Sequence, residues 1–208
     1  MQIISHRGYW KNFEKESNMR IAFERSFDLG LGTETDIRDF GGEILISHDM
    51  PNGSEMRLEE LLEIMDGRNL LLALNIKADG MSERISDILH RYNHTNYFVF
   101  DMSLPEMYYE LNNTNLSIYT GCSDINCKPP LIERATGIWL DAFEGVWYGT
   151  KEIDGFLDVG KNVCIVSEDL HSRSNDKQWE MLRKKYSGDD RVILCTNYPE
   201  DALDYFGS

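Results

Sequence analysis

The sequence has no apolar run long enough to cross a membrane, and no charged and apolar leader precedes its first strand-like run, Gln2-Ile3-Ile4-Ser5. Basic residues are also scarce, with 21 Lys and Arg against 36 Asp and Glu, and the formal net charge is -15. Such a charge opposes binding to nucleic acid and to anionic membranes, although a local cationic pocket can still hold a small anion. We therefore expect a cytoplasmic protein that binds neither nucleic acid nor membranes.

Cysteine and proline are few as well, with four and five residues among 208. Thiols stay reduced in the cytoplasm, so we expect free cysteines. Cys122 and Cys127 lie close together, but no second Cys/His pair at zinc spacing accompanies them. The sequence also lacks a repeat of 20–50 residues and a Pro/Gly/Ser-rich linker. These absences predict one domain, residues 1–208, and give no indication of an oligomeric state.

Short apolar runs alternate with segments of helical period along the whole chain. Strands are expected near residues 2–6, 32–37, 70–76, 97–101, 116–120, 137–141, 162–167 and 191–196. Helices are expected near 18–29, 57–66, 81–92, 104–113, 152–158, 177–186 and 199–206, with a weak connection at 129–136. About eight β/α units predict an α/β protein, a compact (β/α)8 TIM barrel.

One feature interrupts this alternation. Gly41-Gly42 follows the second expected strand, and the returning segment Glu43–Ser47 is apolar at every second residue. A glycine pair between two such segments is typical of a β-hairpin. The barrel is therefore expected to carry a small hairpin extension after its second strand, which brings His48 back to the barrel mouth.

Polar residues gather at the expected ends of the first three strands. They are His6, Arg7, Glu34, Asp36, Asn75 and Lys77. In a β/α barrel these ends meet at one mouth, so the set suits a phosphate ester and a divalent cation. Each residue alone has a simpler explanation: a hydrogen-bonded structural histidine, a solvated carboxylate pair, a satisfied amide or an exposed lysine.

Four ordered motifs within the first 49 residues resemble the glycerophosphodiester phosphodiesterase family of phospholipase-C-like TIM barrels. They are His6-Arg7-Gly8, Glu16 with Asn18, Glu34-Thr35-Asp36 and His48-Asp49. The ending Cys195-Thr196-Asn197-Tyr198-Pro199 resembles the last strand of that family, which usually reads Thr-Asp-x-Pro.

The resemblance implies a role for each matching residue. Glu34 and Asp36 would bind a divalent cation, Mg²⁺ or Ca²⁺, and His6 and His48 would form the general acid/base pair. Arg7 and Lys77 would contact the phosphate. Asp49 would either orient His48 or brace the hairpin.

The third strand departs from the family pattern. Asn75-Ile76-Lys77 stands where the family usually has Glu-x-Lys. Asn75 would therefore offer the cation a neutral oxygen, and the affinity of the site for the metal should fall. Glu168, Asp169, Asp141 or Glu144 could supply the missing carboxylate ligand. Each of them is equally explained as a helix cap or a solvated loop residue.

Two further points stay open at this level. Glu16-Ser17-Asn18 has one inserted residue, so either Glu16 or Asn18 can hold the family position, and simple helix capping also explains the segment. Aromatic residues cluster around the sixth strand and its loop, where they either contact a substrate or pack the loop. They are Trp139, Phe143, Trp147 and Tyr148.

The sequence therefore predicts a metal-dependent phosphodiesterase that hydrolyses a small soluble glycerophosphodiester-like molecule to an alcohol and a phosphomonoester. Attack by water and attack by a neighbouring substrate hydroxyl, through a cyclic phosphate, need the same groups. The alternative is a catalytically weakened barrel that binds a phosphorylated metabolite, which Asn75 motivates.

Overall fold

A computed structural model describes residues 1–207. The strands are β1 (Gln2–His6), β2 (Gly32–Phe40), β3 (Glu43–Ile46), β4 (Leu72–Ile76), β5 (Tyr97–Phe100), β6 (Tyr119–Cys122), β7 (Gly137–Leu140), β8 (Asn162–Val166) and β9 (Val192–Thr196). The helices are α1 (Phe13–Glu16), α2 (Arg20–Asp28), α3 (Leu58–Met65), α4 (Ser82–Arg91), α5 (Leu104–Asn113), α6 (Thr150–Asp158), α7 (Asp176–Tyr186) and α8 (Pro199–Phe206), with a short 3-10 helix, η1 (Glu168–His171).

The chain forms two compact units. The central unit is Arg7–Ile118, and the terminal unit combines Met1–His6 with the chain from Tyr119 onward. Whether the whole chain behaves as one domain stays a prediction.

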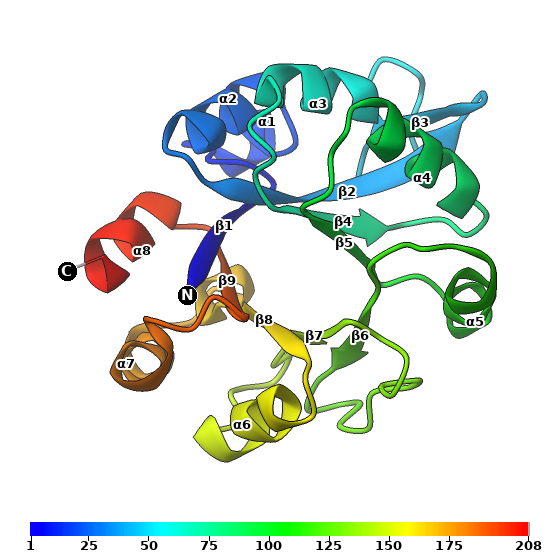
Figure 1. Cartoon of the computed structure of the whole chain (residues 1–208). Coiled ribbons are helices and arrows are strands. Elements are labelled where there is room, and N and C mark those ends of the chain that lie inside the picture. The colour runs from blue at the N-terminus through cyan, green and yellow to red at the C-terminus, as the bar shows by residue number, and fades with distance from the viewer. Residues whose placement is uncertain (208) are drawn as a thin grey trace. The chain divides into compact units, whose positions relative to one another are not determined.

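The central unit is built on three parallel strands in the order β5-β4-β2. Asp36 of β2 is paired in register with Asn75 of β4, so these two side chains lie on the same face of the sheet. Helices α2, α3 and α4 lie on one side of these strands (Figure 1). Packing is dense beneath them, where Phe23, Phe27 and Leu61 are fully buried.

The predicted hairpin extension is confirmed. Beyond Ile37, β2 leaves β4 and pairs antiparallel with β3, from Ile37 opposite Ile46 to Phe40 opposite Glu43. Gly41 and Gly42 both have positive φ, 57° and 96°, which a two-residue turn between strands requires. The second strand is therefore longer than expected, and Glu34 and Asp36 lie within it rather than at its end.

The terminal unit contains five parallel strands in the order β1-β9-β8-β7-β6. Parallel strands place all their carboxyl ends at one edge, so residues that follow β1, β7, β8 and β9 share that edge. Helices α6, α7 and α8 lie on one side of this sheet (Figure 1). Their buried residues, including Ile153, Leu182 and Ala202, pack with Ile165 and Leu194 of the strands.

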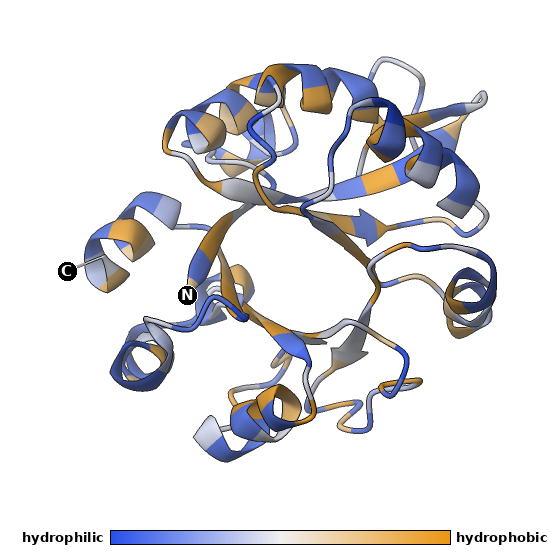
Figure 2. Ribbon diagram, viewed as in Figure 1, coloured by the Kyte–Doolittle hydropathy of each residue, from blue (hydrophilic) through white to orange (hydrophobic). Residues whose placement is uncertain are grey.

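The alternation of parallel strands and helices agrees with the predicted β/α pattern, with local differences. Helix α1 and the helix η1 were not predicted, and within the described residues no α-helix connects β6 to β7, where a weak connection was expected. Figure 2 shows helices such as α3 with both hydrophobic and hydrophilic residues along their length, as amphipathic helices have. Among residues 1–207, none of the helices has the length and apolar character needed to cross a membrane.

Candidate functional site

Asp36 is a buried carboxylate of the central unit with basic and amide partners. It is fully buried, and its Oδ2 lies 2.8 Å from Arg7 Nε and accepts a hydrogen bond of 2.9 Å from Asn18 Nδ2. The side chain of Asn18 is fixed from its other end, because Thr35 Oγ1 donates to its Oδ1 at 2.8 Å. Three of the four sequence motifs therefore meet at Asp36, from Arg7, Asn18 and the β2 strand itself.

Lys77 and Glu34 complete this cluster. Lys77 Nζ lies 3.3 Å from Asp36 Oδ1, so two cations face one carboxylate. Glu34 is 2% exposed, and burial, with a second contribution from the neighbouring Asp36 charge, raises its pKa to about 8, against the opposing effects of Arg7 and Lys77. A buried carboxyl with a raised pKa is a position where an added cation gains a strong ligand.

Two of the residues predicted to bind a cation, Glu34 and Asn75, have the burial and the oxygen atoms that such an ion requires. Asn75 is buried, and its side-chain oxygen has no hydrogen-bond partner among residues 1–207. A buried carbonyl oxygen without a donor, beside a buried carboxyl group, suits an oxygen-seeking divalent ion. Glu34 and Asn75 fit a divalent cation, whereas Asp36 is shared with Arg7 and Lys77. In the described part of the chain, no group of three or more His, Cys, Asp or Glu side chains could hold a metal ion.

A cavity of about 360 Å³ in the central unit joins the motif residues to the hairpin. Its lining includes Arg7, Asn18, His48 and Asp49, with apolar side chains such as Phe13. His48 is 50% exposed and its Nδ1 lies 2.8 Å from Asp49 Oδ1. That hydrogen bond is the largest cause of the lowered pKa of Asp49. The hairpin thus carries His48 to the same cavity as Arg7.

The structure also places the two candidates of the second motif. Glu16 accepts hydrogen bonds from Arg25 Nη1 at 2.6 Å and from the backbone N–H of Lys11 at 2.8 Å, and these bonds lower its pKa to about 2. Asn18, not Glu16, contacts Asp36. Glu16 therefore braces the segment around α1, and Asn18 belongs to the cluster.

His6, the last residue of β1, lies in the terminal unit. Its Nδ1 is 2.7 Å from Asn197 Oδ1, and Asn197 in turn donates from Nδ2 to the carbonyl of Asp169 at 3.2 Å. Because the amide is oriented by this second bond, its oxygen faces the histidine and Nδ1 of His6 carries the proton. Nε2 is then the basic nitrogen, which is the tautomer that a general base needs.

Asp169 is the centre of this part of the terminal unit. Its buried carboxylate accepts from Asn197 N at 2.7 Å, from Thr196 Oγ1 at 2.9 Å and from Asn175 Nδ2 at 3.3 Å, and it also contacts Ser167 Oγ. These donors are all neutral and fill the oxygens of the carboxylate. Asp169 therefore positions Asn197 and is not available as a substitute metal ligand.

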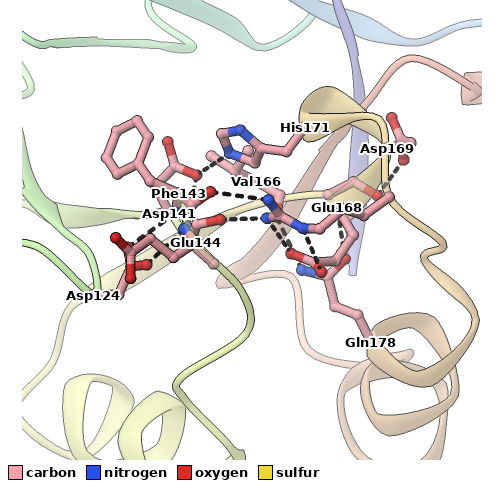
Figure 3. A network of polar contacts seen from close by, with 12 residues as sticks. Asp124, Asp141, Phe143, Glu144, Val166, Glu168, Asp169, His171 and Gln178 are labelled. Carbon is pink, nitrogen blue, oxygen red and sulfur yellow. Dashed lines mark hydrogen bonds and ion pairs between the residues drawn. The ribbon is translucent and has the colours of Figure 1, made fainter.

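Two more of the proposed substitute ligands are also committed to partners. Glu168 forms a two-pronged ion pair with Arg173, at 3.0 Å from Nε and 2.8 Å from Nη2 (Figure 3). Asp141 Oδ1 is 2.7 Å from His171 Nε2 and accepts the backbone N–H of Ala142 at 2.7 Å. Both carboxylates hold the loops that follow β7 and β8.

The aromatic cluster around β7 divides into packing and exposed residues. Trp139 and Tyr148 are buried, and Trp147 donates its indole N–H to the carbonyl of Asp141 at 2.8 Å. Phe143 is 49% exposed. Trp139, Tyr148 and Trp147 therefore pack the loop. Of these four aromatic residues, Phe143 is the one with its ring exposed to solvent.

No protein-family model matches the sequence, and no curated protein matches it. Solved structures do share its fold. A glycerophosphodiester phosphodiesterase from Agrobacterium tumefaciens has a TM-score of 0.72 and 14% identity, and the match covers 100% of both chains. A phosphodiesterase from Oleispira antarctica, solved with the product sn-glycerol-3-phosphate, has a TM-score of 0.74 and 15% identity over 100% of this chain and 97% of the other.

A third structure is more distant. A calcium-dependent phosphoinositol-specific phospholipase C from Pseudomonas sp. has a TM-score of 0.62 and 10% identity, and the match covers 96% of this chain and 89% of that one. Likenesses at this level of identity bear on the fold alone, and they confirm the predicted (β/α)8 TIM barrel. The solved structures whose fold this chain shares include glycerophosphodiester phosphodiesterases and a phospholipase C, the group that its sequence motifs resemble.

Proposed function

We propose that this protein is a metal-dependent phosphodiesterase that hydrolyses a small, soluble glycerophosphodiester-like molecule to an alcohol and a phosphomonoester. The observation that carries the proposal is the cavity at which Arg7, Asn18 and His48 meet, because these residues come from three separate motifs. The fold, shared with glycerophosphodiester phosphodiesterases, supports the same activity. We further propose that the chain acts as a single domain in the cytoplasm.

Each residue has a role in this reaction. Arg7 and Lys77 bind the phosphate oxygens, where a guanidinium and an ammonium offset the negative charge. His6 and His48 transfer the two protons: one takes a proton from the attacking oxygen, and the other gives a proton to the oxygen of the leaving alcohol. Asn197 holds the tautomer of His6, and Asp49 orients His48. The attacking oxygen belongs to water or to a neighbouring hydroxyl of the substrate.

Glu34 and Asn75 would hold the cation, with Asp36 shared between it and the two basic residues. When bound, Mg²⁺ or Ca²⁺ would neutralise the phosphate oxygens and the charge that develops in the transition state. The calcium dependence of the Pseudomonas phospholipase C supports a cation of this class. Because Asn75 is neutral, we expect weaker metal binding than with three carboxylates.

The test is hydrolysis of glycerophosphodiesters and of bis(4-nitrophenyl) phosphate in EDTA and then with Mg²⁺, Ca²⁺ or Mn²⁺. Removing a proton-transferring side chain should lower kcat by about 10²–10⁴-fold in His6→Ala and His48→Ala. The matched control is His90→Ala, because His90 is an exposed histidine of α4 outside the cavity. Metal-independent turnover, or equal activity of wild type and both variants, would contradict the proposal.

A second candidate function is binding of a phosphorylated metabolite without turnover. Asn75 and Asn197 favour it, since both are neutral where the family motifs usually have a carboxylate. Under this candidate, sn-glycerol 3-phosphate binds in calorimetry while no ester is hydrolysed with any cation.

A further inference from the structure

The loop after β7 exposes an aromatic ring while charged side chains hold its backbone on both sides. Asp124 accepts the N–H groups of Phe143 and Glu144 at 2.9 and 2.7 Å. From the other side, Arg173 Nη1 donates to the carbonyl of Phe143 at 2.9 Å, and its Nη2 donates to the carbonyl of Ala142 (Figure 3). Both the N–H and the C=O of Phe143 are bonded to ionised groups, so the backbone of this exposed residue is held in place.

The arginine that holds this loop is itself fixed. Arg173 is bound by both oxygens of Glu168, whose backbone N–H donates to Gln178 Oε1 at 3.1 Å. Gln178 also donates to the hydroxyl of Tyr148 and to the carbonyl of Val166. The loop is thus anchored to α7 and to β8. The backbone that carries the ring does not have to be ordered when a ligand arrives, which reduces the entropic cost of binding.

A histidine lies beside the exposed ring. The ring centroids of Phe143 and His171 are 5.6 Å apart in an edge-to-face arrangement. Nε2 of His171 is bound to Asp141 Oδ1, which also accepts the N–H of Ala142. With this carboxylate ionised, Nε2 carries the proton and the lone pair of Nδ1 is left to accept a hydrogen bond. In Figure 3 Phe143 and His171 lie on one side of the network, and Gln178 extends to the other.

We propose that Phe143 and His171 bind the alcohol part of the substrate, and that this alcohol is a polyol or a sugar ring. The inference rests on the proposed phosphodiesterase function and specifies its substrate. Both residues follow strands β7 and β8 at the carboxyl edge of the terminal unit, the edge at which His6 ends β1. A ligand that reaches His6 at this edge can extend along it toward the pair.

The chemistry of the pair selects the alcohol. A polyol has a C–H face that packs on an aromatic ring and hydroxyl groups that donate to a histidine nitrogen. A trimethylammonium group can pack on the ring of Phe143 but has no hydrogen-bond donor for His171, so it would use only one of the two side chains. An anionic alcohol would approach Asp141 and Glu144 in a protein of net charge -15. A neutral hydroxylated group uses both side chains and meets no repulsion.

The experiment compares KM and kcat for glycerophosphoinositol, glycerophosphocholine and bis(4-nitrophenyl) phosphate in the wild type, Phe143→Ala and His171→Ala. We expect the wild type to have the lowest KM for the inositol ester. Each variant should raise that KM about tenfold, the equivalent of roughly 1.4 kcal/mol, with kcat and the aryl ester little changed.

Two controls separate binding from folding. Phe143→Tyr keeps the ring and should retain a KM close to that of the wild type, while Tyr108→Ala removes an exposed aromatic ring of α5 and should change nothing. Equal losses on all three substrates, unchanged kinetics of Phe143→Ala, or a lower wild-type KM for the choline ester would overturn the inference. Absence of turnover with every ester and cation would instead overturn the proposed function, and the inference with it.

Discussion

At Asn75, substitution by aspartate adds one negative charge to the buried cluster with almost no change in side-chain shape. Asn75 pairs in register with Asp36, and its buried oxygen has no hydrogen-bond partner among residues 1–207. An aspartate there adds a third carboxyl group next to Glu34 and Asp36. Arg7 and Lys77 offset part of the repulsion between these groups, and a divalent cation should relieve the rest.

We predict that Asn75→Asp is less stable than the wild type in EDTA, by about 1–3 kcal/mol, because it buries another charged group. With Mg²⁺ or Ca²⁺ it should bind the ion at least about tenfold more tightly, since divalent affinity rises with the number of ligand charges. Thermal unfolding with and without EDTA, together with calorimetric titration, measures both effects. Asn112→Asp adds the same charge on exposed α5. A variant that binds the ion no more tightly would remove Asn75 from the predicted site.

Single residues also mark how far the sequence could predict the candidate site. The Glu-x-Asp pair, Arg7, Lys77 and His48 were predicted as site residues because their order and spacing match a known series. Asn197 and His171 were not assigned, since their roles come from hydrogen bonds to residues 191 and 30 positions away. No local pattern encodes such contacts. The sequence left open whether Glu16 or Asn18 belongs to the cluster. In the structure Glu16 forms an ion pair with Arg25, which the sequence alone does not specify, and Asn18 contacts Asp36.

At the scale of elements, the long apolar strands and periodic helices were predicted to within a few residues. Helix α1 and the helix η1 have four residues each, too few to show a helical period. The length of β2 was underestimated for another reason. Its outer part, Arg38–Phe40, is polar or exposed and is paired only by β3. Barrel strands are buried on both faces and can be recognised in the sequence as continuous apolar runs, whereas such a two-stranded ribbon has no run of this kind.

Helix α5 carries a carboxyl group on its buried side, and it makes the stability of the fold depend on pH. Glu110 is 1% exposed, and burial raises its pKa to about 7, with smaller contributions from Glu106 and Asp79. Between pH 4.5 and 7 the unfolded chain ionises at Glu110 while the folded chain keeps the proton. Stability therefore falls as pH rises through this window.

We predict that Glu110→Gln is more stable than the wild type at pH 8, by up to about 3 kcal/mol, and nearly equal to it at pH 4.5. Urea unfolding at several pH values measures the difference. Glu83→Gln, at an exposed position of α4, is the matched control and should track the wild type. A Glu110→Gln difference that stays constant with pH would show that this carboxyl group ionises normally.

At the scale of the whole molecule, the excess of 36 acidic over 21 basic residues acts against the folded state. Like charges repel more strongly when the chain is compact, and salt screens them with a Debye length that falls from about 30 Å at 0.01 M to about 10 Å at 0.1 M. We predict that Tm rises by roughly 2–8 °C between 10 and 300 mM NaCl in EDTA, which corresponds to about 1–2 kcal/mol. Choline chloride at equal ionic strength should give the same rise. A Tm that falls with salt would mean that ion pairs outweigh the net charge.

The pairing of β1 with β9 has a consequence for how the protein is made. Gln2–Ser5 lie beside Ile193–Thr196, so the first strand leaves the ribosome long before its partner exists. At about 5–20 residues per second, the interval is roughly 10–40 s. All of the central unit, Arg7–Ile118, is translated within that interval. During synthesis the edge of the first strand that will face β9 therefore stays unpaired until the last strand has been made, and an unpaired strand edge is a site of unwanted strand pairing.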